Sequence, residues 1–186
     1  FETGNNVFVI VESGELHDPE TIRAINRLDR RYTEKIDETT TVTSLADVVR
    51  QGNGGKIPQT EAGVERAITR VRAQGPESAA MVNRLEPESG TTIILASYGN
   101  VNTFDRGAFL PQRDSDIIYN RVQTETDLAP LPPGMTTTIT GQPVFENAAF
   151  GLMLPEMITL FAGAFALIFT VVYLVMRAKV ERGWHV

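Results

Sequence analysis

A stretch of twenty residues without a charge, residues 157–176 (MITLFAGAFALIFTVVYLVM), is the feature that most limits how this chain can fold. At about 1.5 Å of rise per residue, such a helix is about 30 Å long, which matches the hydrocarbon core of a bilayer. The alternative is a buried core helix, but a chain of 186 residues rarely buries a helix that is apolar on every side. The stretch therefore predicts a membrane-spanning helix.

The predicted span contains few polar groups. Thr159, Thr170 and the hydroxyl of Tyr173 are the polar groups in it, and a threonine in a helix can donate a hydrogen bond to its own backbone. Intramembrane proton or ion pathways use ionisable side chains, and this helix has none. We therefore expect no proton-relay residue in this chain.

Small side chains within the span could pack against other membrane helices. Ala162, Gly163 and Ala166 lie close together in the sequence, and small residues let helix backbones approach closely. Lipid-facing alanine and glycine are an equally good interpretation, because such residues are common in membrane helices.

Charges on the two sides of the span predict its orientation. Glu146 and Glu156 precede the span without a nearby base, whereas one acid, Glu181, and three bases follow it. The bases are Arg177, Lys179 and Arg182. Because Lys and Arg are enriched on the cytoplasmic side of a membrane, we expect residues 1–155 outside the cell and the tail, residues 178–186, in the cytoplasm.

The outer part of the chain is acidic and contains no cysteine. Without the charges that follow the span, 14 Lys and Arg residues stand against 22 Asp and Glu residues, a formal charge of −8. Such a domain is a poor partner for nucleic acid. The absence of cysteine excludes disulfides and thiolate metal sites.

The outer part alternates short apolar runs with helical patterns. Residues 7–12 (VFVIVE) and 91–97 (TTIILAS) are apolar and rich in β-branched residues, as buried strands are. Asp18-Pro19-Glu20 begins a helix with an N-cap acceptor and a proline in the first turn. The helix that follows has one apolar stripe, made of Ile22, Ile25, Leu28, Tyr32 and Ile36.

The full order predicts an α+β fold of the ferredoxin-like, split β-α-β type. The four strands are predicted at 7–12, 39–45, 91–97 and 135–140, and the two main helices at 19–36 and 115–127. The apolar positions of the second helix are Ile117, Ile118, Val122 and Leu128. A helical turn is predicted at 47–50. Two short helices at 61–72 and 77–84 form an insertion, about residues 51–88, in the middle of the fold.

A very short segment joins the last strand to the membrane helix. Gly141, Gln142 and Pro143 separate the strand from a helix, residues 144–177, that continues through Pro155 into the span. Pro143 can occupy a first helical turn, and Gly141 permits backbone angles closed to other residues. We expect this segment to couple the outer domain, residues 1–143, to the membrane; a glycine that merely fits a tight turn is an equally good interpretation.

Candidate sites for chemistry are weak. Residues 52–56 (GNGGK) superficially resemble a phosphate-binding loop, but the spacing is wrong and a surface turn is the better interpretation. His17 lies near Glu12, Glu15 and Asp18, and a solvated helix-capping loop is again favoured over a metal site. We therefore predict no catalytic site, metal or cofactor, and expect that the chain is not an enzyme.

Several segments of the chain form a recognisable series. VFVIVE is followed by the Asp-Pro-Glu helix start, and Leu131-Pro132-Pro133-Gly134-Met135 leads through Ile139-Thr140-Gly141-Gln142-Pro143-Val144 into a span that ends at Met176-Arg177. In this order the segments resemble the outer porter domain of transporters of the resistance–nodulation–division superfamily. The resemblance covers about residues 5–182. It is closest to the branch of the mycobacterial large membrane proteins and archaeal putative exporters.

The resemblance implies a larger assembly and a function. The chain would be an outer domain and the following helix of a transporter with twelve membrane helices. That helix would also begin a sterol-sensing-domain-like set of helices. Its partners would be the bilayer, the other membrane helices, a second outer domain, a hydrophobic or amphiphilic substrate and further copies of the transporter. Export driven by an ion gradient is the implied activity.

Two other functions fit the same sequence. A single-span binding or sensor domain would share the fold and anchor, and a secretion-accessory member of the superfamily would act on polypeptide. Another apolar span soon after residue 186 is expected for the transporter and not for the sensor.

Overall fold

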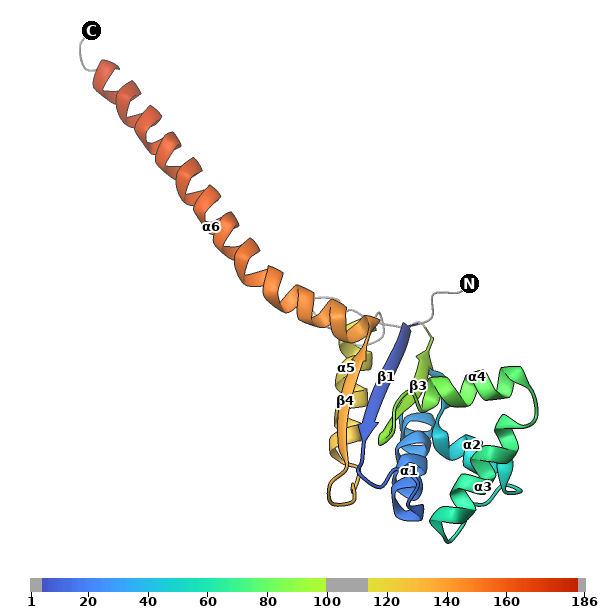
Figure 1. The fold of residues 1–186 in the computed structure, drawn as a ribbon. Coiled ribbons are helices and arrows are strands. Elements are labelled where there is room, and N and C mark those ends of the chain that lie inside the picture. The colour runs from blue at the N-terminus through green and yellow to red at the C-terminus, as the bar shows by residue number, and fades with distance from the viewer. Residues whose placement is uncertain (1–4, 100–113, 184–186) are drawn as a thin grey trace. The chain divides into compact units, whose positions relative to one another are not determined.

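The computed structural model describes residues 5–99 and 114–183 and shows an α+β fold followed by a long C-terminal helix (Figure 1). The chain divides into two compact units, Phe1–Asn147 and Ala148–Val186. Residues 184–186 of the predicted cytoplasmic tail lie outside the described residues.

One four-stranded sheet forms the frame of the first unit. Its strands lie in the order β2-β3-β1-β4, and every neighbouring pair is antiparallel. The strands are β1 (Asn5–Glu12), β2 (Thr39–Thr43), β3 (Thr91–Tyr98) and β4 (Thr136–Gly141). The prediction that the four segments share one sheet is therefore confirmed.

Alternation along the central strands places one face of the sheet in the core. Val7, Val9 and Val11 of β1 are fully buried, as every second side chain of a strand points to the same face. Thr92, Ile94, Ala96 and Tyr98 repeat the pattern in β3. The intervening Phe8 is 37% exposed, so the opposite face carries partly exposed apolar side chains.

Two helices pack on the buried face, as the sequence predicts. The whole apolar stripe of α1 (Pro19–Lys35) and Ile117, Ile118 and Val122 of α5 (Asp114–Asp127) join the same core. The hydroxyl of Tyr32 in α1 lies 2.7 Å from Oγ1 of Thr126 in α5, which itself donates to the carbonyl of Val122. Leu128, the fourth apolar position assigned to this helix, does not join the core: it lies one residue beyond the end of α5 and is 62% exposed.

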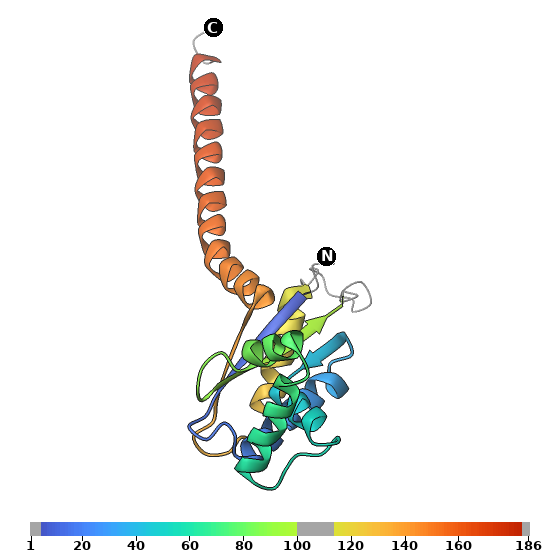
Figure 2. The same ribbon diagram turned by 45° about the vertical axis from the view of Figure 1, so that its right-hand side comes forward.

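Three helices lie between β2 and β3. They are α2 (Leu45–Gly52), α3 (Glu61–Arg72) and α4 (Pro76–Leu85), and they lie side by side in both views (Figures 1 and 2). The predicted strand 39–45 is too long, since β2 ends at Thr43 and Leu45 begins α2. Ser44 is the N-cap, and its backbone N–H donates to Asp47 at 3.0 Å. This N-terminal cap ends the strand.

The last helix, α6 (Gln142–Gly183), begins directly after β4. The predicted three-residue connector is therefore wrong: Gly141 is the last residue of β4, and Gln142 and Pro143 are the first two residues of α6. Among the described residues, one helical segment, Glu156–Arg177, is long and apolar enough to cross a membrane.

Candidate functional site

The junction between β4 and α6 contains a glycine that no other residue can replace without strain. Gly141 has a φ of +123° and pairs with Val7 in the sheet. A Cβ atom at this position would lie 2.5 Å from the carbonyl oxygen of Asn6 and 3.2 Å from Cα of Val7. Both the backbone angle and the space therefore require glycine.

The other junction residues lie in the first turn of α6. Gln142 is its first residue, and the buried Pro143 is its second. Proline is tolerated there because the first N–H groups of a helix have no partner within the helix. The local geometry by itself accounts for Gly141 and Pro143, so a coupling role for this junction stays a prediction.

The remaining predicted site residues lie along α6. Pro155 lies within the helix, and Ala162, Gly163 and Ala166 are in the apolar segment, where all three are exposed. The hydroxyl of Thr170 donates to the carbonyl of Ala166 at 2.7 Å, which is the expected way to satisfy a hydroxyl in an apolar helix. The packing role of the small residues stays a prediction.

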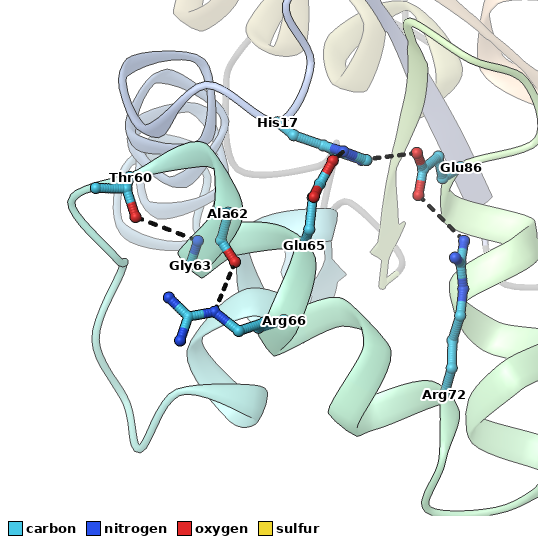
Figure 3. A network of polar contacts seen from close by, with 8 residues as sticks. All are labelled: His17, Thr60, Ala62, Gly63, Glu65, Arg66, Arg72 and Glu86. Atoms are coloured by element: carbon cyan, nitrogen blue, oxygen red, sulfur yellow. Dashed lines mark hydrogen bonds and ion pairs between the residues drawn. The ribbon is translucent and has the colours of Figure 1, made fainter.

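A polar network joins the loop before α1 to α3 and to the end of α4 (Figure 3). Nε2 of His17 lies 2.8 Å from Oε1 of Glu86, and Nδ1 lies 3.8 Å from Oε1 of Glu65. The second carboxylate oxygen of Glu86 accepts a hydrogen bond from Arg72 at 3.3 Å. The His17 side chain is 26% exposed and that of Glu86 is 12% exposed, so the pair is largely shielded from water.

The carboxylates that gather on His17 are not the ones that are near it in sequence. Asp18 caps α1 by accepting from the backbone N–H of Glu20 at 2.7 Å, which confirms the predicted helix cap. Glu12 accepts a hydrogen bond from Thr136 of β4. Glu65 and Glu86 reach His17 only because α3 and α4 pack beside this loop, and sequence alone gives no signal for that contact.

This environment favours protonated His17. The hydrogen bond that His17 donates to Glu86 raises the pKa of His17 above 6.5, and the charges of Glu86, Glu65 and Glu61 raise it further, while burial opposes them. A cavity of about 150 Å³ beside the imidazole is lined in part by Glu15, Glu61 and Glu86. Within residues 5–99 and 114–183, no three His, Asp or Glu side chains are arranged to hold a metal ion. The network is suited to binding a proton.

A second titratable group is buried between α1 and α2. Oδ2 of Asp29, a residue that is 6% exposed, accepts a hydrogen bond from the Ser44 hydroxyl at 2.7 Å. The same hydroxyl lies 3.2 Å from Oδ2 of Asp47. Burial is the main cause that raises the pKa of Asp29 from 3.8 to about 6; Asp47 raises it further, and the Ser44 hydrogen bond and Arg50 lower it.

The loop that superficially resembles a phosphate-binding loop has a packing role at its first glycine. Gly52 is the last residue of α2, and a Cβ atom there would lie 2.1 Å from the carbonyl oxygen of Ala67 in α3. Gly54 and Gly55 have positive φ angles of 63° and 85° in a turn. These features support the interpretation as a surface turn beside a close helix–helix contact.

The chain was compared with protein families, curated proteins and solved structures. No protein-family model, no curated protein and no solved structure matches the chain.

Proposed function

We propose that this chain is the outer domain and following membrane helix of an exporter of the resistance–nodulation–division type. In this proposal the first unit handles hydrophobic or amphiphilic substrates outside the membrane, and an ion gradient drives export through the rest of the transporter. The chain has no catalytic role in it. The observation that carries the proposal is the direct passage of a sheet strand, β4, into a helix that contains a candidate span.

The topology of the sheet supports the proposal. The elements follow the order strand, helix, strand, strand, helix, strand when the three inserted helices are set aside. Together with the antiparallel order β2-β3-β1-β4, this sequence of elements supports a ferredoxin-like split β-α-β domain. In this proposal the three helices between β2 and β3 are an insertion into that fold.

The β4–α6 junction supports a mechanical role. A flexible linker would absorb a displacement of the membrane helix, whereas here no residue separates strand from helix. Gly141 and Val7 are paired in the sheet, and Pro143 is buried. A movement of the start of α6 would therefore act on β4 and its neighbour β1.

The test is to insert four Gly/Ser residues after Gly141 in the full-length protein. Folded protein in the membrane and export of a fluorescent hydrophobic dye are measured in the same cells. We expect normal abundance with export lost, because the inserted residues would absorb the displacement. The matched control carries the same insertion after Gly54, where a Cβ atom would meet nothing within 4 Å; it should keep both abundance and export.

Three outcomes would contradict the proposal. Export that continues at normal abundance with the insertion after Gly141 would show that this junction transmits nothing. Dye efflux that does not depend on the unmodified protein would instead favour a single-span binding or sensor domain. A protein-export role in the same superfamily would appear as lost polypeptide secretion with unchanged dye efflux.

A further inference from the structure

A depression of about 320 Å³ lies between α1 and the segment that leads to β4. It is lined by Glu20, Arg23, Arg27, Pro130, Leu131 and Pro132. The two arginines are one helical turn apart on α1, so their side chains lie on the same face of that helix. The depression thus combines two guanidinium groups with a wall of two prolines and a leucine.

Neither of these two arginines forms an ion pair within the described part of the chain. Arg23 donates to Oε1 of Gln59 at 3.0 Å, and Arg27 donates to the carbonyl oxygen of Pro130 at 3.2 Å. Both acceptors are uncharged. The later arginines of α1 differ, because Arg30 pairs with Glu34 and Arg31 pairs with Glu125.

The two like charges are four residues apart on one helix and repel each other by a few tenths of a kcal/mol. An anion bound between them would relieve this repulsion. Each guanidinium is held by one hydrogen bond to a neutral oxygen, which leaves most of its five N–H donors for another acceptor. Guanidinium groups fixed in this way match the geometry of carboxylates and phosphates.

The opposite wall of the depression is fixed in place. Leu131 is partly buried against the core, and the backbone N–H of Met135 donates to the carbonyl of Pro132 at 3.2 Å. Proline restricts the backbone further. The wall therefore offers a preformed apolar surface next to the two charges, as small-molecule sites commonly do.

We propose that this depression binds a small organic anion. Its carboxylate or phosphate monoester lies between Arg23 and Arg27, and its apolar body packs on Leu131 and Pro132. Glu20 lines the same depression and disfavours ligands with several negative charges. This inference does not depend on the transport proposal, because it concerns a ligand site on the outer domain alone.

Protection from phenylglyoxal, which modifies arginine side chains, tests the site in the full chain embedded in zwitterionic lipid nanodiscs. Phenyl phosphate and benzoate are the probes, benzamide is the uncharged analogue, and peptide mass spectrometry follows each arginine. We expect modification of Arg23 and Arg27 to slow about threefold or more when a probe is present at a few times its Kd. Benzamide should protect neither residue.

The same molecule contains a matched internal control. Arg66 and Arg70 are also four residues apart on one helix, and each donates to a backbone carbonyl, that of Ala62 or Gly52. In the described residues neither forms an ion pair, but neither lines the depression, so the probes should leave their modification unchanged. The variant Arg23→Gln should abolish protection of Arg27, whereas Arg66→Gln should leave it intact.

Three results would overturn the proposal. Equal protection of all four arginines would show general charge screening, and protection of none would show that the depression binds neither probe. Protection by inorganic phosphate that equals protection by phenyl phosphate at the same concentration would remove the assigned role of Leu131 and Pro132.

Discussion

Nε2 of His17, in the loop before α1, lies 2.8 Å from Oε1 of Glu86, the residue that caps the end of α4. The contact links residues 69 positions apart in the chain. It connects the inserted helices to the loop that precedes α1. Since the bond is strongest when the imidazole is protonated, the strength of this link depends on pH.

The first prediction is that His17→Gln lowers stability only at acidic and neutral pH. The raised pKa means that the folded chain binds the proton more tightly than the unfolded chain. The stabilisation is therefore complete below about pH 6.5 and is lost as the pH rises through the folded-state pKa. We expect a loss of about 1 kcal/mol at pH 5.5, measured by thermal unfolding of the full chain, and little loss at pH 9.

His185→Gln is the control for this variant, because it removes the only other histidine in the sequence. It should leave unfolding unchanged at both pH values. A loss for His17→Gln that is the same at pH 5.5 and pH 9 would show that the imidazole acts through packing alone.

The second prediction is that Asp29→Asn stabilises the protein above pH 7. The pKa of Asp29 is raised to about 6, so folding favours the protonated acid, and stability falls as the pH rises from about 4 through about 6. Asparagine resembles the protonated acid in shape: its oxygen can accept from Ser44 and its amide can donate to Asp47. We expect a gain of roughly 1–2 kcal/mol at pH 7.5 and almost none at pH 4.

The exposed Asp37 provides the comparison for that substitution. Asp37→Asn should change the unfolding free energy little at either pH. Destabilisation by Asp29→Asn at pH 7.5 would mean that the ionised carboxylate is needed where it lies between α1 and α2.

The third prediction concerns three glycines that differ in the room for a Cβ atom and in the backbone angle φ. Gly141→Ala combines a φ of +123° with a Cβ contact of 2.5 Å to Asn6 and should cost about 2 kcal/mol or more. Gly134→Ala has a positive φ but open space and should cost about 1 kcal/mol. Gly14→Ala has neither problem and should be nearly neutral. Chemical denaturation gives the three values, and equal costs at Gly134 and Gly141 would contradict the close contact with β1.

The fourth prediction concerns orientation in the membrane. The chain has no cysteine, so single cysteines at Ser13 and Lys179 can be labelled without background. An impermeant thiol reagent applied to intact cells should label Ser13→Cys and should not label Lys179→Cys, because the bases after the span are expected in the cytoplasm. Labelling both positions, or Lys179→Cys alone, would contradict this orientation. Labelling after permeabilisation shows that both variants are present.

The sequence by itself determined the features that depend on neighbouring residues, namely a helix cap, a buried helix face and an apolar segment. Asp18 caps the helix that it precedes, and the three- and four-residue spacing from Ile22 to Tyr32 sets the buried stripe of α1. The apolar segment Glu156–Arg177 is recognisable because length and composition alone decide whether a helix can span a bilayer. The strand predicted at 39–45 extends too far, although the sequence contains a signal for its true end: Ser44 followed by Asp47 is a helix-capping pattern.

Tertiary structure alone decided which distant groups meet. Glu65 and Glu86 surround His17 because α3 and α4 pack beside its loop, and Gly141 must be glycine because β4 pairs with β1. The depression beside Arg23 and Arg27 exists because the segment at residues 130–132 passes next to α1. Such contacts depend on how the core closes, and the packing of a core is a property of the whole chain that no short pattern of residues encodes.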